Sequence, residues 1–153
     1  MSRHGIPTAS YHTFDRFSAA KAYVKAVNNR IVIKASGLAA GKGVLMPSSK
    51  EEAILGLESL MVRKDFGPAG NEVVIEELLI GDEISIGICS DGYIIRTFPS
   101  AQDHQRVYDG NVGPNTGGMG CYAPTPLCSD VQMQEIYDKI LKPTIDGMRQ
   151  EGR

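Results

Sequence analysis

The chain has 153 residues, and 16 Lys plus Arg against 18 Asp plus Glu give a formal net charge of −2 at pH 7. Its 42% hydrophobic and 22% charged residues exclude disordered, collagen-like and disulfide-scaffold classes. The small net charge, without a cluster of Lys or Arg, excludes a nucleic-acid-binding face. No apolar run is long enough to cross a membrane, and the N-terminus lacks a signal-peptide core, so we expect a cytoplasmic protein without membrane partners.

An amphipathic helix is predicted over residues 17–27, where apolar residues recur at intervals of three and four. The Asn28-Asn29 pair should end this helix, and Asp15 or Ser18 is the expected N-cap. The β-branched run at residues 31–35 then predicts a strand.

A second, brief extended segment at residues 43–46 is closed by Pro47 and leads into another helix. Ser48, followed three residues later by Glu51, is a capping-box pattern and predicts the start of this helix. Helical spacing of the apolar residues continues to about Arg63.

Three strand-like runs follow at residues 73–79, 83–90 and 93–98. Asp91-Gly92 separates the last two and indicates an antiparallel hairpin with a two-residue turn. Residues 99–126 show no periodicity, and a loop of this length is typically functional or disordered. Its spaced polar residues favour a functional loop.

A helix is predicted near the end of the chain, beginning at Ser129 or Asp130. Because proline lacks a backbone N–H group, Pro143 should kink or interrupt this helix.

The strongest local signal is the glycine-rich segment KASGLAAGKG at residues 34–43. It is not a Walker loop, because three residues instead of four separate Gly37 from Gly41, and neither Ser nor Thr follows Lys42. It does not open a helix as a dinucleotide fingerprint does. Small residues let backbone N–H groups approach phosphate oxygens, so we expect a nucleotide lid framed by Lys34 and Lys42. The plainer alternatives are a half-exposed strand lysine and a solvated turn lysine.

The second signal is the run VVIEELLIGDE at residues 73–83, an apolar strand that ends in acids. The backbone of an extended segment can recognise a purine, and an acceptor side chain such as Glu83 can bind ribose hydroxyls. The alternative is that the acids decorate the solvent edge of a strand and its turn.

The third signal is the pair of segments QDHQR at residues 102–106 and GPNTGGMG at residues 113–120. Arg106 can hold a phosphate or carboxylate through two hydrogen bonds, and consecutive N–H groups at residues 116–118 can form an anion nest. We therefore expect a substrate loop. The alternative is that the glycines only form turns and that His104 is an ordinary surface histidine.

Taken together, the segments KASGLAAGKGV, VIEELLIGDEIS, QDHQRVYDG and GPNTGGMG resemble the glycinamide ribonucleotide synthetases, or phosphoribosylamine–glycine ligases, of the ATP-grasp superfamily. The resemblance covers most of the chain, including the order and spacing of the motifs. It implies an α+β ATP-grasp fold, with a small lobe of antiparallel sheet plus helices at residues 9–76. Residues 77–153 would be the incomplete start of the central lobe, and residues 1–8 a remnant of a preceding domain or linker.

The activity that the resemblance implies is ATP-dependent ligation of glycine to 5-phosphoribosylamine, a step of de novo purine synthesis. The glycine carboxylate would first be phosphorylated by ATP, and the amine would then displace phosphate to give glycinamide ribonucleotide. Making such an acyl phosphate needs cations on the transferring phosphoryl group and exclusion of water. The implied cofactors are ATP with Mg²⁺ or Mn²⁺.

The resemblance also assigns roles to single residues. The α and β phosphates would meet Lys34, and the segment over the β and γ phosphates would include Ser36, Gly37, Gly41, Lys42 and Gly43. The adenine end would hold Glu76, with Glu77 and Leu79 acting through backbone groups, and Glu83 would hold the ribose. The catalytic residues would be Asp103, His104 and Arg106, beside a substrate-binding turn of Asn115, Thr116, Gly117 and Gly118.

Two family segments are absent from this sequence: the glycine motif of an N-terminal domain and an acidic, asparagine-containing strand that ligates magnesium. We therefore expect the metal ligands to lie beyond residue 153 and the chain alone to be inactive. The three cysteines form no CxxC pair, so no zinc site is predicted. The alternatives are another ATP-grasp ligase, or a non-catalytic nucleotide-binding or assembly segment whose partners are other domains of a multifunctional purine-synthesis protein.

Overall fold

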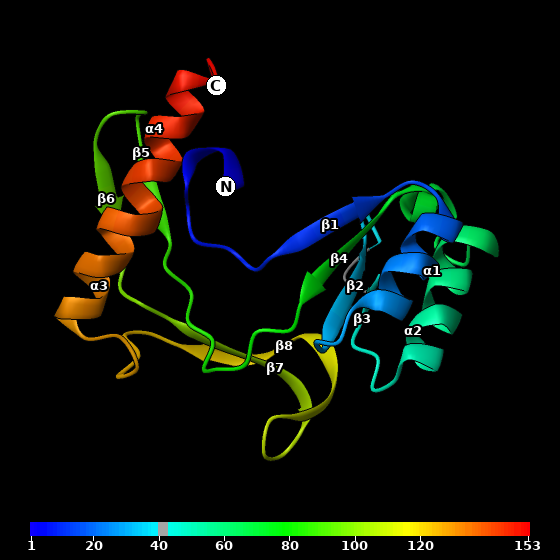
Figure 1. Cartoon of the computed structure of the whole chain (residues 1–153). Coiled ribbons are helices and arrows are strands. Elements are labelled where there is room, and N and C mark those ends of the chain that lie inside the picture. The colour runs from blue at the N-terminus through cyan, green and yellow to red at the C-terminus, as the bar shows by residue number, and fades with distance from the viewer. Residues whose placement is uncertain (40–42) are drawn as a thin grey trace. The chain divides into compact units, whose positions relative to one another are not determined.

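The computed structural model describes residues 1–39 and 43–153, and it divides into two compact units. One unit is Ala9–Ile80, and the other combines Met1–Thr8 with Gly81–Arg153. Figure 1 labels the helices and strands of both units. In the described parts of the chain, no helix is both long and apolar enough to cross a membrane.

The unit Ala9–Ile80 contains a four-stranded antiparallel sheet with the strand order β1–β4–β2–β3. The strands are β1 (Tyr11–Phe14), β2 (Ile31–Ala35), β3 (Val44–Leu45) and β4 (Val73–Glu77). The central strands β2 and β4 pair along their whole length, from Ile31 opposite Glu77 to Ala35 opposite Val73. The predicted bounds of β2 are confirmed, as its β-branched residues led us to expect.

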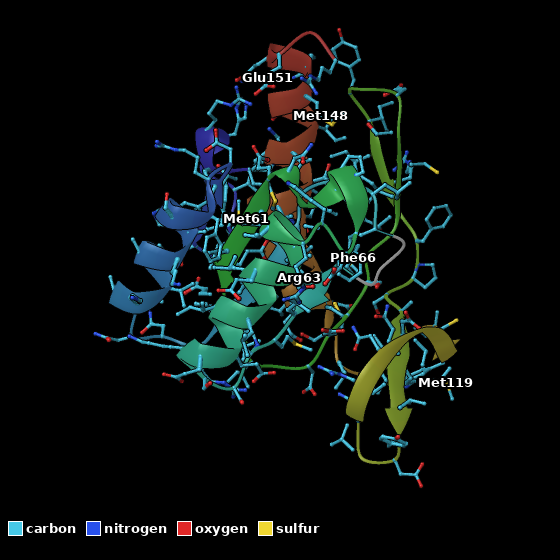
Figure 2. The ribbon with its side chains drawn as sticks, turned by 90° about the vertical axis from the view of Figure 1, so that its right-hand side faces the viewer. Met61, Arg63, Phe66, Met119, Met148 and Glu151 are labelled. Carbon is cyan, nitrogen blue, oxygen red and sulfur yellow. The ribbon has the colours of Figure 1, made fainter. Side chains whose placement is uncertain are left out.

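Helices cover one face of this sheet (Figure 1). They are α1 (Phe17–Ala26) and α2 (Lys50–Leu57), which continues as the π-helical turn η2 (Glu58–Val62); the short 3₁₀ helix η3 (Gly67–Asn71) precedes β4. The core between helices and sheet consists of Ala20, Val24, Ile31, Ile33, Ala53, Leu57, Leu60, Met61, Val73 and Ile75. Figure 2 labels Met61, which belongs to this core, and Phe66, which is partly buried and packs against it.

The start of α1 differs from the prediction. Its N-cap is Arg16, which forms no side-chain capping hydrogen bond, so neither Asp15 nor Ser18 has the predicted role. Arg16 is extended (φ −123°, ψ 124°), which is the usual N-cap conformation, and Ser18 therefore already lies inside the first turn.

The start of α2 is shifted by one residue from the predicted Ser48 and Glu51. The N-cap is Ser49, whose Oγ accepts from the Glu52 N–H group at 3.1 Å. The Glu52 carboxylate in turn accepts from both the N–H and the Oγ of Ser48, each at 2.7 Å. The sequence Ser-Ser-Lys-Glu-Glu contains two overlapping capping patterns, and the spacing alone does not decide between them.

The second unit contains two hairpins and an interrupted C-terminal helix. Its elements are η1 (Ser2–His4), β5 (Ile88–Ser90), β6 (Ile95–Thr97), β7 (Gln102–Tyr108), β8 (Val112–Tyr122), α3 (Asp130–Ile136), η4 (Tyr137–Leu141) and α4 (Lys142–Gln150). Both strand pairs, β5–β6 and β7–β8, are antiparallel.

The β5–β6 hairpin is antiparallel as predicted, but the two-residue turn is wrong. Ser90 lies opposite Ile95, so the loop spans residues 91–94. The Asp91 carboxylate accepts from the N–H groups of Ile94 and Tyr93, at 2.7 and 2.9 Å, and these bonds hold its pKa below the usual value. This side chain therefore stabilises the longer loop.

The predicted loop at residues 99–126 is wrong over most of its length, because β7 and β8 form a hairpin there. Tyr108 lies opposite Val112, and the turn between them places Gly110 and Asn111 at φ 74° and 58°. The pairing shifts register at His104/Arg106 and again before Tyr108. Such irregularities break the two-residue alternation by which strands are found in a sequence.

The C-terminal helix begins at Asp130, one of the two predicted residues, and its N-cap Ser129 forms a capping box with Gln132. The predicted interruption is also confirmed, because the π-helical turn η4 ends one residue before Lys142 and Pro143 lies in the first turn of α4. The missing N–H group of Pro143 thus directly follows a π-helical turn, where the backbone departs from regular α-helical hydrogen bonding.

Residues 1–8 pack against the end of α4. The His4 ring lies against Gly147, where a Cβ would approach His4 Cγ to 2.8 Å, and His4 Nε2 is 2.9 Å from Glu151 Oε1. The hydrogen bond from His4, with the charge of Arg3, holds the pKa of Glu151 below its usual value. Figure 2 shows Glu151 and Met148 at this end of the helix.

Candidate functional site

The sheet of the unit Ala9–Ile80 has one face free of helices, and Lys34 belongs to that face. Ile31 and Ile33 of β2 are in the core, so the alternation of the strand assigns Val32 and Lys34 to the opposite side. On β4, Val73 and Ile75 are in the core, and the paired register assigns Val74 and Glu76 to the helix-free face. This face therefore combines apolar side chains with one cation and one anion.

Lys34 and Glu76 form an ion pair on the helix-free face. The Nζ atom of Lys34 is 2.6 Å from Oε2 of Glu76, and their side chains are 40% and 23% exposed. The ammonium is therefore fixed by the sheet yet open to solvent, as contact with an anionic ligand requires.

The part of the glycine-rich segment that directly follows β2 is held by residues 69–72. The Ser36 N–H group donates to the Glu72 carbonyl at 2.9 Å, and the Ser36 hydroxyl donates to Glu72 Oε1 at 2.8 Å. The Gly37 N–H group donates to the Ala69 carbonyl at 3.2 Å. Glu72 was not predicted from the sequence, because a single acidic residue before a strand belongs to no recognisable motif.

The far end of the segment returns to β2 at Gly43. Its carbonyl accepts from the Ala35 N–H group at 2.8 Å, and a Cβ on Gly43 would lie 2.9 Å from that of Ala35. The predicted phosphate contacts Gly41 and Lys42 lie outside the described residues. One described end of the segment is thus held by residues 69–72, and the other by Ala35 of β2.

The predicted adenine edge begins at the end of β4 and continues beyond it. The Glu77 N–H group donates to the Ser10 carbonyl at 3.0 Å, and the Glu77 carboxylate accepts from the Ser10 N–H group at 2.8 Å. The Leu78 N–H group donates to the Arg30 carbonyl at 3.0 Å. Leu79 is 67% exposed. The Glu77 side chain and the N–H groups of Glu77 and Leu78 are thus all used within the protein.

The remaining predicted residues belong to the other unit. Glu83 is exposed there, outside the named strands. Asp103, His104 and Arg106 lie on β7, and Asn115, Thr116, Gly117 and Gly118 lie on β8.

Gln105, which was not predicted, connects three of these residues. Its Nε2 donates to Asp103 Oδ2 at 2.8 Å, its Oε1 accepts from Asn115 Nδ2 at 3.4 Å, and its carbonyl accepts from Thr116 Oγ1 at 2.9 Å. Gln105 lies between Asp103 and residues of strand β8, and this position becomes evident only from the pairing of β7 with β8. The hairpin therefore brings Asp103, Asn115 and Thr116 into one polar network.

Two other predicted residues have different neighbours. His104 stacks on Tyr122, with ring centroids 5.8 Å apart, and Arg106 Nη1 donates to the Gly113 carbonyl at 2.6 Å. The structure thus anchors both side chains to β8, His104 to its C-terminal end and Arg106 to its N-terminal end.

The predicted turn at residues 115–118 is wrong, because these residues lie within strand β8. The Gly118 N–H group donates to Thr116 Oγ1 at 3.1 Å, so it does not join a set of converging free N–H groups. Successive N–H groups of a strand point to opposite sides, which is incompatible with the predicted anion nest.

The described residues include no group of three or more His, Cys, Asp and Glu side chains close enough to hold a metal ion.

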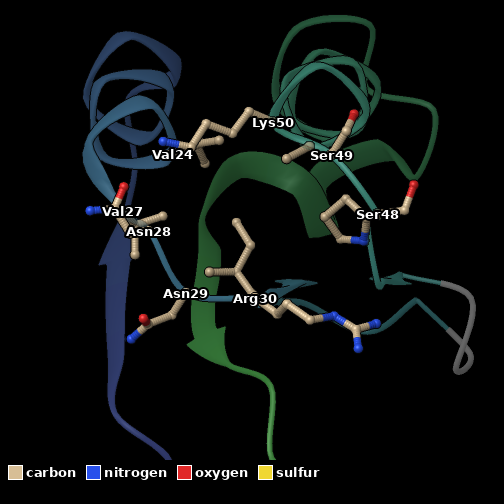
Figure 3. Close-up of a pocket in the computed structure, with 11 residues that line it drawn as sticks. Val24, Val27, Asn28, Asn29, Arg30, Ser48, Ser49 and Lys50 are labelled. Carbon is tan, nitrogen blue, oxygen red and sulfur yellow. The ribbon is translucent and has the colours of Figure 1, made fainter.

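Two pockets contain none of the predicted site residues. The first, of about 190 Å³, lies between α1, the start of β2 and the start of α2, as Figure 3 shows. Much of its polar lining is used within the protein, because Lys50 Nζ donates to the Lys25 carbonyl at 2.7 Å and Ser49 caps α2. The second, of about 450 Å³, includes Pro7, Ile84 and Ile136 of the other unit.

The fold and these motifs define an ATP-grasp domain, and a family comparison agrees. The family described as "Phosphoribosylglycinamide synthetase, ATP-grasp (A) domain" matches residues 1–153. The chain belongs to this family.

Similar proteins include enzymes and multifunctional proteins of purine biosynthesis. The chain is 55% identical over 152 residues to the "Bifunctional purine biosynthetic protein ADE1" of Schizosaccharomyces pombe, covering 99% of this chain and 19% of that protein. It is 49% identical over 153 residues to the phosphoribosylamine–glycine ligase of Halalkalibacterium halodurans, covering 100% and 36%. The chain thus spans about a fifth to a third of these relatives.

A solved structure shows the same fold. The crystal structure of phosphoribosylamine–glycine ligase from Thermotoga maritima superposes with a TM-score of 0.84 and 35% sequence identity. The match covers 99% of this chain and 38% of that one. The expected α+β ATP-grasp fold is confirmed.

Proposed function

We propose that this chain is the nucleotide-binding part of a phosphoribosylamine–glycine ligase. The observation that carries the proposal is Lys34, which lies on the helix-free face of the sheet beside the start of the glycine-rich segment. The family match over the whole chain and the relatives that bear this name support the same function.

The proposed nucleotide contacts follow the two central strands. Lys34 would neutralise charge on the α and β phosphates, and the segment from Ser36 to Gly43, with Lys42, would lie along the β and γ phosphates. Residues 76–79, at the end of β4 and directly beyond it, would contact adenine, and Glu83 would bind the ribose. Mg²⁺ or Mn²⁺ would enter with the phosphate oxygens of ATP.

The proposed reaction has two steps. A glycine carboxylate oxygen attacks the γ-phosphorus of ATP, which forms glycyl phosphate and releases ADP. The amine of 5-phosphoribosylamine then attacks the carbonyl carbon, phosphate leaves, and the nitrogen loses one proton. Asp103, His104 and Arg106 would act at the glycine and phosphoribosylamine end, and Asn115, Thr116, Gly117 and Gly118 would help to bind these substrates.

Two measurements test this function. Calorimetric titration of Mg-ATP into the chain is expected to show saturable binding near one nucleotide per chain. In a chimera, this chain replaces the corresponding segment of the H. halodurans ligase, and ADP release is measured with glycine, with 5-phosphoribosylamine and with both. Turnover only with both substrates supports the ligase. A folded chimera that binds Mg-ATP but turns over neither substrate supports the non-catalytic alternative.

A further inference from the structure

The Ser36 and Gly37 N–H groups and the Ser36 hydroxyl, which follow β2 in the glycine-rich segment, all donate hydrogen bonds within the protein. The N–H group and the hydroxyl of Ser36 both donate to Glu72, at 2.9 and 2.8 Å. The Gly37 N–H group donates to the Ala69 carbonyl at 3.2 Å. A phosphate could receive these hydrogen bonds only if the contacts with residues 69–72 were first broken.

Close packing reinforces these hydrogen bonds. A Cβ on Gly37 would lie 2.6 Å from the Cα of Ala69, and a Cβ on Gly70 would lie 2.0 Å from the Leu60 carbonyl oxygen. Gly37 therefore contacts the Ala69 backbone directly, and residues 69–70 rest on the core helix turn that contains Leu60. The point where the chain leaves β2, two residues after Lys34, is thus connected to the rigid core.

We propose that Glu72 is a positioning residue of the nucleotide site. Its carboxylate holds the Ser36 hydroxyl, which fixes the start of the glycine-rich segment relative to Lys34. Ser36 and Gly37 serve this anchor: they would position the segment along the phosphates without donating hydrogen bonds to them, and Lys34 remains the proposed phosphate contact among the described residues. The proposal rests on the proposed nucleotide site and goes further by assigning Glu72 to it.

The negative charge of Glu72 and its proposed positioning role predict opposite effects of its substitution on ATP affinity. ATP is strongly anionic, so removing the negative charge of Glu72 should by itself strengthen ATP binding. Removing the anchor should weaken binding, because the segment must then be ordered when the nucleotide binds. Glu72→Gln removes the charge but keeps an oxygen that accepts from Ser36, whereas Glu72→Ala removes both.

The experiment compares the Mg-ATP dissociation constants of five variants of the chain by calorimetry: Glu72→Ala, Glu72→Gln, Ser36→Ala, the Ser36→Ala/Glu72→Ala double variant and Glu51→Ala. Ser36→Ala should bind about fivefold more weakly, the equivalent of one net hydrogen bond, and Glu72→Ala should lose less than this because it also removes the negative charge. The double variant should be no weaker than the single ones, because both remove the same bond. Glu72→Gln should bind at least as tightly as the wild type. Glu51→Ala is the control for losing an exposed acid.

Hydrogen exchange of the Ser36 and Gly37 amides provides a test that needs no nucleotide. Their protection should fall in Ser36→Ala and Glu72→Ala and persist in Glu72→Gln. If protection does not change in the alanine variants, the proposed positioning role of Glu72 is wrong, and this conclusion needs no nucleotide binding. Failure of the wild type to bind Mg-ATP is a separate result, which contradicts the proposed function. If Ser36→Ala weakens binding equally with and without Glu72, Ser36 contacts the nucleotide directly and the proposal is overturned.

Discussion

The ammonium of Lys34 lies 2.6 Å from the carboxylate of Glu76 on the helix-free face of the sheet. Both side chains are partly exposed, so this ion pair contributes only about 0–1 kcal/mol to stability. A phosphate group can therefore bind Lys34 in place of Glu76 with little loss of stability. The pair keeps the ammonium oriented on the sheet without committing it to a structural role.

Lys34→Ala is expected to weaken Mg-ATP binding about 10- to 100-fold, because it removes a hydrogen bond between two charged groups. Lys25→Ala is the matched control, since it removes the same charge from an exposed position on α1 of the same unit. The measurement is calorimetric titration, with circular dichroism to establish that each variant is folded. Equal affinities of the two variants would place the phosphates away from Lys34.

Leu57→Ala is expected to lower the free energy of unfolding by about 2–5 kcal/mol, because it leaves a cavity in the core between α2 and the sheet. Leu57 is fully buried, whereas Leu55 on the same helix is 60% exposed. Leu55→Ala should therefore change the free energy by less than about 0.5 kcal/mol. Urea unfolding followed by circular dichroism measures both, and similar losses in the two variants would contradict the assigned packing of α2.

The sequence predicts best those features that are determined by neighbouring residues. Strand β2 and the start of the C-terminal helix at Ser129 or Asp130 are encoded locally, by β-branched residues and by a residue suited to a helix N-cap, and both predictions are confirmed. The β7–β8 hairpin depends on pairing across the turn at Gly110, and its register shifts hide the alternation. Asp109-Gly110 is the signal that could have revealed it, since the same dipeptide type indicated the hairpin at Asp91.

The candidate site follows the same rule. Lys34 was predicted from the glycine-rich segment that it begins, and its place on the helix-free face agrees with strand alternation. Its ion pair with Glu76 and the contact of Ser36 with Glu72 join β2 and the residue directly after it to residues some forty positions further along the chain. Such partners are decided by sheet order, which a local pattern does not contain.

Gly70→Ala is expected to destabilise the unit Ala9–Ile80 by about 1–3 kcal/mol, because the new Cβ would clash with a backbone carbonyl that cannot move away. That carbonyl belongs to Leu60, whose oxygen would lie only 2.0 Å from the Cβ. Gly81→Ala is the control, since no atom lies within 4 Å of its Cβ position. Thermal unfolding separates the two, and an unchanged midpoint for Gly70→Ala would show that η3 and η2 do not pack as closely as described.

The shifted cap of α2 makes a prediction about acid stability. The hydrogen bonds from the Ser48 hydroxyl and N–H group hold the pKa of Glu52 below its usual 4.5. A carboxyl group with a lowered pKa in the folded state stabilises the fold at pH values above 4.5, and this stabilisation disappears as the pH falls through the lowered value. Glu52→Gln should therefore reduce the loss of stability between pH 7 and about 3, while Glu51→Gln should not.

The measurement is the thermal midpoint of the wild type and of both variants across this pH range. Other carboxylates with lowered pKa values, among them Asp65 and Asp91, leave a residual slope in every protein, so the difference between the two variants is the informative quantity. At neutral pH, Ser49→Ala should cost about 1 kcal/mol as the loss of an N-cap. If Glu51→Gln flattened the pH profile instead, the helix would begin at the pair that the spacing first indicated.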